Sequence, residues 1–125
     1  MTPWKVLLVD DEEEFVRTLA ERLTLRGIEA RMALNGEEAL QALEEALPDV
    51  IVLDMMMPGL GGLDVLKRVR HQYPEVRVIL LTGHSSPRDG VEGMRLGAFD
   101  YLMKPVNIKE LIEKIGKAME EGSPE

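Results

Sequence analysis

Short apolar segments alternate with longer amphipathic segments along the chain, and this alternation restricts the fold more than any other feature. The apolar segments cover residues 6–9, 28–33, 50–53, 76–81 and 99–103. The first, third and fourth are nearly continuous runs of Val, Ile and Leu, which is typical of strands buried on both faces. The sequence therefore predicts an α/β fold of five β–α units, with a parallel sheet, right-handed crossovers and helices on both faces.

The amphipathic segments carry apolar residues at helical spacing and residues that mark helix boundaries. Asp11, Asn35 and Asn107 are predicted N-caps, the last of them as part of a capping box. An apolar stripe predicts that the second helix extends through Leu47. A third helix is expected over residues 62–72.

A fourth helix, expected over residues 85–96, is the least stable of the set. Gly90 and Gly93 each cost about 1 kcal/mol relative to alanine inside a helix, and Pro87 fits only its first turn. Marginal stability suits an element that changes between two states. The alternative explanation is that the glycines allow the helix to pack closely on the sheet.

Composition limits the classes of protein to be considered. The 125 residues suffice for one domain, expected over residues 1–121 with a frayed tail at 122–125. A net charge of −8 argues against non-specific binding to nucleic acid or to anionic membranes. No cysteine, signal peptide or membrane-spanning run is present in the sequence. We therefore expect a cytoplasmic protein with nothing preceding the domain.

Polar residues follow four of the five predicted strands. Asp10 and Asp11 follow the first strand, Asp54 the third, Thr82 the fourth and Lys104 the fifth. The carboxyl ends of parallel strands share one edge of the sheet, where such folds bind ligands. Three neighbouring carboxylates repel one another unless a hard cation such as Mg²⁺ intervenes. An aspartate can act as a nucleophile that forms an acyl phosphate, while a lysine and a hydroxyl bind its phosphoryl oxygens.

Each of these residues also has an ordinary structural explanation. Asp10 and Asp11 could be helix-capping acids, and Asp54 could be a turn residue. Thr82 could be a β-branched strand residue and Lys104 a surface lysine. The following acids, 12–14, are expected to form a solvated first helical turn. The combination of all these residues at one edge favours the functional interpretation.

Four motifs at these strand ends carry a family resemblance. They are Leu8-Val9-Asp10-Asp11, Leu53-Asp54-Met55-Met56-Met57-Pro58-Gly59, Leu80-Leu81-Thr82-Gly83 and Tyr101-Leu102-Met103-Lys104-Pro105. Over residues 5–119 the chain resembles the receiver domain of bacterial two-component response regulators. One motif alone is weak, whereas four in this order are specific. The resemblance implies a flavodoxin-like, doubly wound fold with strand order 2-1-3-4-5.

The resemblance also implies roles for individual residues. Asp54 is expected to be the phosphoacceptor, assisted by Thr82 and Lys104. Asp10, Asp11, Asp54 and the backbone carbonyl of Met56 are expected to bind Mg²⁺ or Mn²⁺. The Lys104–Pro105 peptide bond is expected to be cis. Such a domain is not an enzyme, because it catalyses only its own phosphorylation and dephosphorylation.

The switch and tuning residues are less sharply defined. Thr82 and an aromatic residue are expected to report phosphorylation. Tyr101 and Phe99 compete for the aromatic position, and strand alternation would place them on the same side. The family pattern favours Tyr101. Met56 and His84 are candidates for tuning the lifetime of the acyl phosphate, although His84 could simply be an exposed loop histidine.

The implied partners are a sensor histidine kinase or a histidine phosphotransfer protein and a downstream output protein or domain. The output surface is expected on the fourth helix, fifth strand and fifth helix, and phosphorylation could drive homodimerisation. The chain could be a stand-alone regulator or the receiver part of a longer transcriptional regulator. An aspartyl-phosphate phosphatase is disfavoured because Met56 stands where such enzymes carry a second acid. A flavin- or nucleotide-binding protein is disfavoured because acids, not glycines, follow the first strand.

Overall fold

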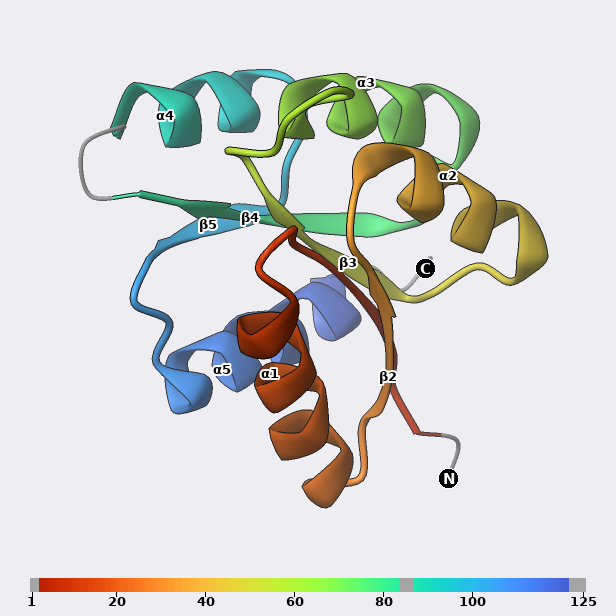
Figure 1. The fold of residues 1–125 in the computed structure, drawn as a ribbon, viewed down its shortest axis with the longest axis vertical. Helices are drawn as coiled ribbons and strands as arrows, with labels where there is room; N and C mark the ends of the chain where they lie inside the picture. Colours follow the sequence, from red (N-terminus) through yellow and green to blue (C-terminus); the bar gives the residue numbers. More distant parts are fainter. Residues whose placement is uncertain (1–2, 84–86, 122–125) are drawn as a thin grey trace.

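The five apolar segments form one parallel sheet in the computed structural model of the chain, which describes residues 3–83 and 87–121 (Figure 1). The strands are β1 (Lys5–Val9), β2 (Glu29–Ala33), β3 (Val50–Asp54), β4 (Arg77–Thr82) and β5 (Asp100–Met103). Their spatial order is β2-β1-β3-β4-β5, and every neighbouring pair is parallel. The predicted fold class and strand order are therefore confirmed. The predicted tail at 122–125 lies outside the described residues.

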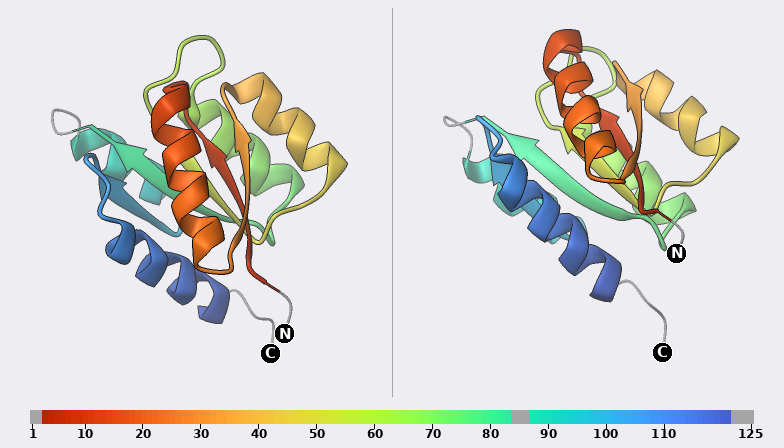
Figure 2. Two further views of the ribbon diagram at one scale, coloured as in Figure 1. Left: turned by 60° about the horizontal axis from the view of Figure 1, so that its bottom comes forward. Right: turned by 90° about the horizontal axis from the view of Figure 1, so that it is seen from below.

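Helices cover both faces of the sheet. They are α1 (Glu13–Leu25), α2 (Gly36–Glu45), α3 (Gly62–Gln72), α4 (Pro87–Arg95) and α5 (Ile108–Glu121). The helices α2, α3 and α4 lie on one face, and α1 and α5 lie on the other (Figures 1 and 2). Among the described residues, no helix combines the length and the apolar character needed to span a membrane.

The buried apolar side chains form two clusters, one on each face of the sheet. Alternate residues of β1 divide between them: Leu7 and Val9 belong to the α2–α3–α4 side, and Val6 and Leu8 to the α1–α5 side. The central strands β1, β3 and β4 are buried along almost their whole length, as their continuous Val, Ile and Leu runs predict. This double core holds the carboxyl ends of the central strands in fixed positions.

The predicted N-caps are confirmed for two helices and wrong for the first. Asn35 Oδ1 accepts a hydrogen bond from the Glu38 amide at 2.8 Å, and Asn107 Oδ1 accepts from the amides at 109 and 110. Residue 12, not Asp11, stands at the cap of α1, and its side chain makes no capping bond. Its amide instead donates to Asp10 Oδ1 at 2.9 Å. Asp11 is therefore not required for the start of α1.

The second helix is shorter than its apolar stripe predicted. It ends at Glu45, and Ala46 adopts an extended conformation. Leu47 consequently lies beyond the helix, with 42% of its surface exposed. An apolar residue at helical spacing was therefore not sufficient to extend the helix.

The fourth helix packs directly on the sheet. A Cβ atom added at Gly93 would lie 1.9 Å from Leu80 Cδ1, in the fully buried part of β4. This contact supports the alternative in which glycine allows close packing. The helix ends at Arg95, one residue earlier than predicted, and residues 85 and 86 lie outside the described part of the chain.

Candidate functional site

Three carboxylates meet at the carboxyl edge of the sheet. Asp10 directly follows β1, Asp11 comes next, and Asp54 is the last residue of β3. One oxygen from each lies within 4.8 Å of the others. Asp10 and Asp54 are buried, with 1% and 3% of their surfaces exposed, whereas Asp11 is exposed. The structure thus brings together the three acids that the sequence analysis placed at the carboxyl ends of the strands.

Lys104 brings a positive charge to this acidic cluster. Its Nζ lies 2.8 Å from Asp10 Oδ2, 2.9 Å from Glu12 Oε1 and 3.7 Å from Asp54 Oδ1. The ammonium group also lies 4.9 Å from the centroid of the Phe15 ring, within range of a cation–π interaction. Partial burial works to lower the pKa of the Lys104 ammonium, but its bonds to Asp10 and Glu12 outweigh burial and raise that pKa. Lys104 is therefore charged at physiological pH.

The carboxyl group of Asp54 has a raised pKa. Burial raises it from an ordinary value of 3.8 to about 6. The Met56 amide, which donates to Asp54 Oδ1 at 3.2 Å, and the charge of Lys104 act in the opposite direction, while Asp10 adds to the increase. A cation bound beside Asp54 would favour its charged form. The environment of Asp54 is thus the kind found at functional sites.

Thr82 contributes a buried hydroxyl group to the same edge. It is the last residue of β4, next to β3, and is fully buried. Among the described residues its Oγ1 has no hydrogen-bond partner. Buried hydroxyls normally find a partner, so an unpaired one requires an explanation. A phosphoryl oxygen placed between Thr82 and Lys104 would supply the missing partner.

The backbone around the site has two further features. The Lys104–Pro105 peptide bond is cis, as the family resemblance implies. The start of α3 lies against the end of β3, where a Cβ atom at Gly62 would lie 2.6 Å from the Asp54 carbonyl oxygen. Glycine at position 62 therefore allows α3 to begin in contact with the backbone of Asp54. Sequence analysis did not identify this role, because only the packed structure shows the close approach.

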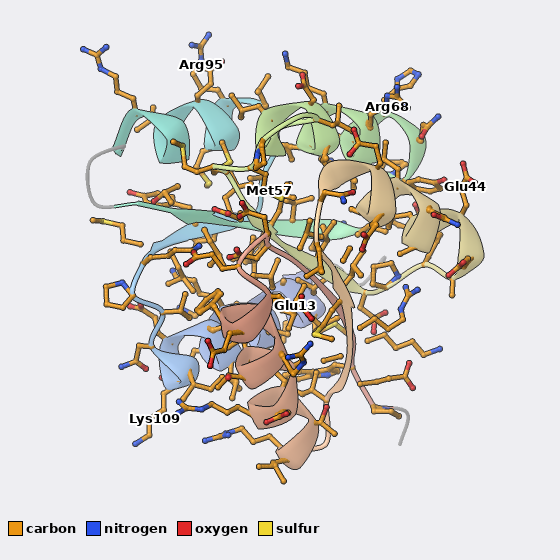
Figure 3. The ribbon with its side chains drawn as sticks, in the orientation of Figure 1. Glu13, Glu44, Met57, Arg68, Arg95 and Lys109 are labelled. Atoms are coloured by element: carbon orange, nitrogen blue, oxygen red, sulfur yellow. The ribbon has the colours of Figure 1, made fainter. Side chains whose placement is uncertain are left out.

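The candidate tuning and switch residues are placed differently from one another. The Met56 side chain is 62% exposed beside Asp54, whereas Met57 is buried in the segment before α3 (Figure 3). His84 lies outside the described residues. Tyr101 packs with the α2–α3–α4 cluster, but Phe99 packs with the α1–α5 cluster. The prediction that they share a side is wrong, because Phe99 precedes β5 and strand alternation does not extend to it.

Glu12 is a charged residue of the site that sequence analysis missed. It was expected to belong to a solvated helical turn, yet its carboxylate holds Lys104. Glu12 and Lys104 are separated by 92 positions in the sequence. The only available signal was the position of Glu12 directly after the acid pair, on the same strand edge as Lys104.

The fold and site define a doubly wound α/β domain with an acidic, lysine-containing site at the carboxyl edge of its sheet. The sequence matches the response regulator receiver domain family over residues 6–116. It is 45% identical over 113 residues to the transcriptional regulatory protein CpxR of Escherichia coli (strain K12), covering 89% of this chain and 47% of CpxR. It is 40% identical over 117 residues to the sensory transduction protein RegX3 of Mycobacterium tuberculosis (strain CDC 1551 / Oshkosh), covering 94% of this chain and 51% of RegX3.

A solved structure gives the same result. The response regulator receiver domain protein from Clostridium thermocellum has a TM-score of 0.90 and 34% sequence identity, with coverage of 94% of this chain and 95% of that chain. The chain therefore belongs to the receiver domain family of two-component response regulators. It spans about half the length of the curated relatives CpxR and RegX3.

Proposed function

We propose that this chain is a phosphorylation-dependent signalling switch that accepts a phosphoryl group on Asp54. The observation that carries the proposal is the convergence of three acids on one edge with Lys104 and the unpaired Thr82 hydroxyl. The donor would be a sensor histidine kinase or a histidine phosphotransfer protein. The implied location is the cytoplasm.

The donor set fits a hard divalent cation. Asp10, Asp11 and Asp54 offer carboxylate oxygens within 4.8 Å of one another, and the Met56 carbonyl would complete the protein ligands. Oxygen ligands of this type suit Mg²⁺ or Mn²⁺ rather than zinc or copper. When bound, such a cation neutralises negative charge on the transferring phosphoryl group.

The transfer step is a nucleophilic substitution at phosphorus. An oxygen of the Asp54 carboxylate forms a bond to phosphorus while the bond from phosphorus to the donor breaks, and the donor keeps the electron pair. Lys104 would turn from Glu12 towards the phosphoryl oxygens, and the Thr82 hydroxyl would donate a hydrogen bond to one of them. In this proposal the chain catalyses only its own phosphorylation and dephosphorylation, so it is a phosphoacceptor rather than an enzyme.

The output surface in this proposal is formed by α4, β5 and α5. Phosphorylation adds about 1.5 to 2 negative charges and three acceptor oxygens next to Thr82. Movement of Thr82 towards them would change the space available to Tyr101. Val91, Met94 and Met103 expose apolar surface on α4 and β5 and would contact an output partner or a second copy of the chain. CpxR is named as a transcriptional regulatory protein, which favours a transcriptional output through a partner or a further domain.

The proposal is tested by intact-mass measurement after incubation with acetyl phosphate. We expect one phosphoryl adduct on the wild-type protein when Mg²⁺ is present and none when the metal is chelated. Asp11→Asn serves as a variant that weakens the metal site without removing the acceptor, and it should need a higher Mg²⁺ concentration. Equal adduct formation with and without divalent metal would contradict the proposal.

A further inference from the structure

Two glycines on α4 face neighbouring residues of the sheet. Gly93 lies over Leu80 of β4, and Gly90 lies over Tyr101 of β5. Leu80 and Tyr101 are themselves partners in the register of the β4–β5 pair. Because the two glycines are three residues apart, they lie on the same face of the helix. The glycine face of α4 therefore packs against the adjacent residues Leu80 and Tyr101. Tyr101 is the candidate aromatic switch residue.

The ring of Tyr101 occupies space that any side chain at position 90 would need. A Cβ atom at Gly90 would lie 2.9 Å from Tyr101 Cδ2 and 3.0 Å from both Cε2 and Cγ. Such distances are shorter than normal carbon–carbon contacts, which are about 3.5–4.0 Å. The close atoms form one edge of an aromatic ring, which cannot bend away as a flexible chain could. Ring and helix can therefore keep their present positions only while residue 90 is glycine.

The helix α4 also exposes apolar residues to solvent. Val91 is adjacent to Gly90 and is 58% exposed, and Met94 is 41% exposed. Arg95 extends from the outer side of the helix, away from the sheet (Figure 3). A change in the position of the Tyr101 ring would thus reach the exposed surface through one short helix.

We infer that Gly90 is a positioning residue that seats the Tyr101 ring against α4 and couples movement of the ring to movement of the helix. The inference rests on the proposed function for its signalling meaning, since it names the contact that would carry a change at Thr82 to the output surface. The contact itself is a property of the unphosphorylated protein. The inference can therefore be tested separately from phosphorylation.

A double-mutant cycle on positions 90 and 101 tests the contact. In the wild-type background, Gly90→Ala should speed hydrogen exchange of the α4 amides about fivefold or more, because overpacking outweighs the better helix propensity. In a Tyr101→Ala background the same substitution should slow exchange about fivefold, because only the propensity gain remains. If Gly90→Ala alone does not fold, a folded double variant supports the inference. The same sign in both backgrounds, or loss of folding in both, would overturn it.

Ring-labelled tyrosine adds a spectroscopic measurement that a general loss of stability would not mimic. The sequence contains two tyrosines, so the resonance of Tyr73, which lies beyond the end of α3, is an internal control. Before any phosphodonor is added, Gly90→Ala should shift the Tyr101 resonance and leave that of Tyr73 in place. An unshifted Tyr101 resonance would overturn the inference. Absence of an adduct on the wild-type protein with acetyl phosphate and Mg²⁺ would instead count against the proposed function alone.

Discussion

At Lys104, three carboxylates share one ammonium group. The distances of 2.8 Å to Asp10 and 2.9 Å to Glu12, against 3.7 Å to Asp54, place the charge farther from the proposed phosphoacceptor than from the other two acids. Glu12 is 65% exposed, so water screens its ion pair with Lys104 and the pair is weak. Glu12 thus holds the Lys104 side chain in the unphosphorylated protein, but the contact is weak enough for Lys104 to move towards a phosphoryl group on Asp54.

This arrangement predicts the effect of Glu12→Gln. Removing the Glu12 charge should free Lys104 to move towards Asp54 and speed phosphorylation by acetyl phosphate at saturating Mg²⁺ about twofold to fivefold, the range that an exposed ion pair of up to about 1 kcal/mol allows. Glu14→Gln is the matched control, since it removes the same charge from the exposed turn nearby. Equal acceleration in both variants would mean that net charge, not the contact with Lys104, is responsible.

Among the helices and strands, those whose position depends on local sequence were predicted best. The continuous apolar runs were sufficient to locate β1, β3 and β4. The caps at Asn35 and Asn107 were sufficient to locate the starts of α2 and α5. The meeting of the acids with Lys104 followed from the geometry of parallel strands. The contact of Glu12 with Lys104 depends on tertiary packing, which no local pattern encodes. The different sides of Phe99 and Tyr101 depend on the start of β5 at Asp100, which the apolar run 99–103 did not mark.

The packing of α4 predicts the effect of Gly93→Ala. The new methyl group would collide with Leu80 Cδ1, so we expect the free energy of unfolding to fall by about 1–3 kcal/mol despite the better helix propensity of alanine. Urea denaturation measures this change. Adding Leu80→Val removes the colliding methyl group and should recover part of the loss. A Gly93→Ala protein that is more stable than wild type would contradict the close packing.

At the scale of the whole molecule, the acidic site opposes folding when no metal is bound. The chain has a net charge of −8, and its site places Asp10, Asp11 and Asp54 side by side. Because the pKa of Asp54 is raised to about 6 in the folded protein, the folded state binds more protons than the unfolded state between about pH 4 and 6. The contribution of this group to stability is therefore present at low pH and is lost as the pH rises through 6.

This linkage predicts a pH-dependent difference between wild type and Asp54→Asn in the presence of a chelator. The two proteins should have similar stability at pH 4, and at pH 7.5 the variant should be more stable by on the order of 2 to 3 kcal/mol. Mg²⁺ should then stabilise the wild type more than the variant, because the folded site binds it. Chemical denaturation at the two pH values measures the effect, and a difference that does not change with pH would contradict the raised pKa.

In the proposed function Asp54 carries the phosphoryl group, and chemical trapping of the acyl phosphate can identify the residue that does so. The protein is phosphorylated with acetyl phosphate and Mg²⁺, reduced with borohydride, which converts an aspartyl phosphate to homoserine, and mapped by peptide mass spectrometry. We predict homoserine at position 54, none at Asp10 or Asp11, and no reduced product in Asp54→Asn. Homoserine at another aspartate in the wild-type protein, with position 54 unchanged, would contradict this prediction.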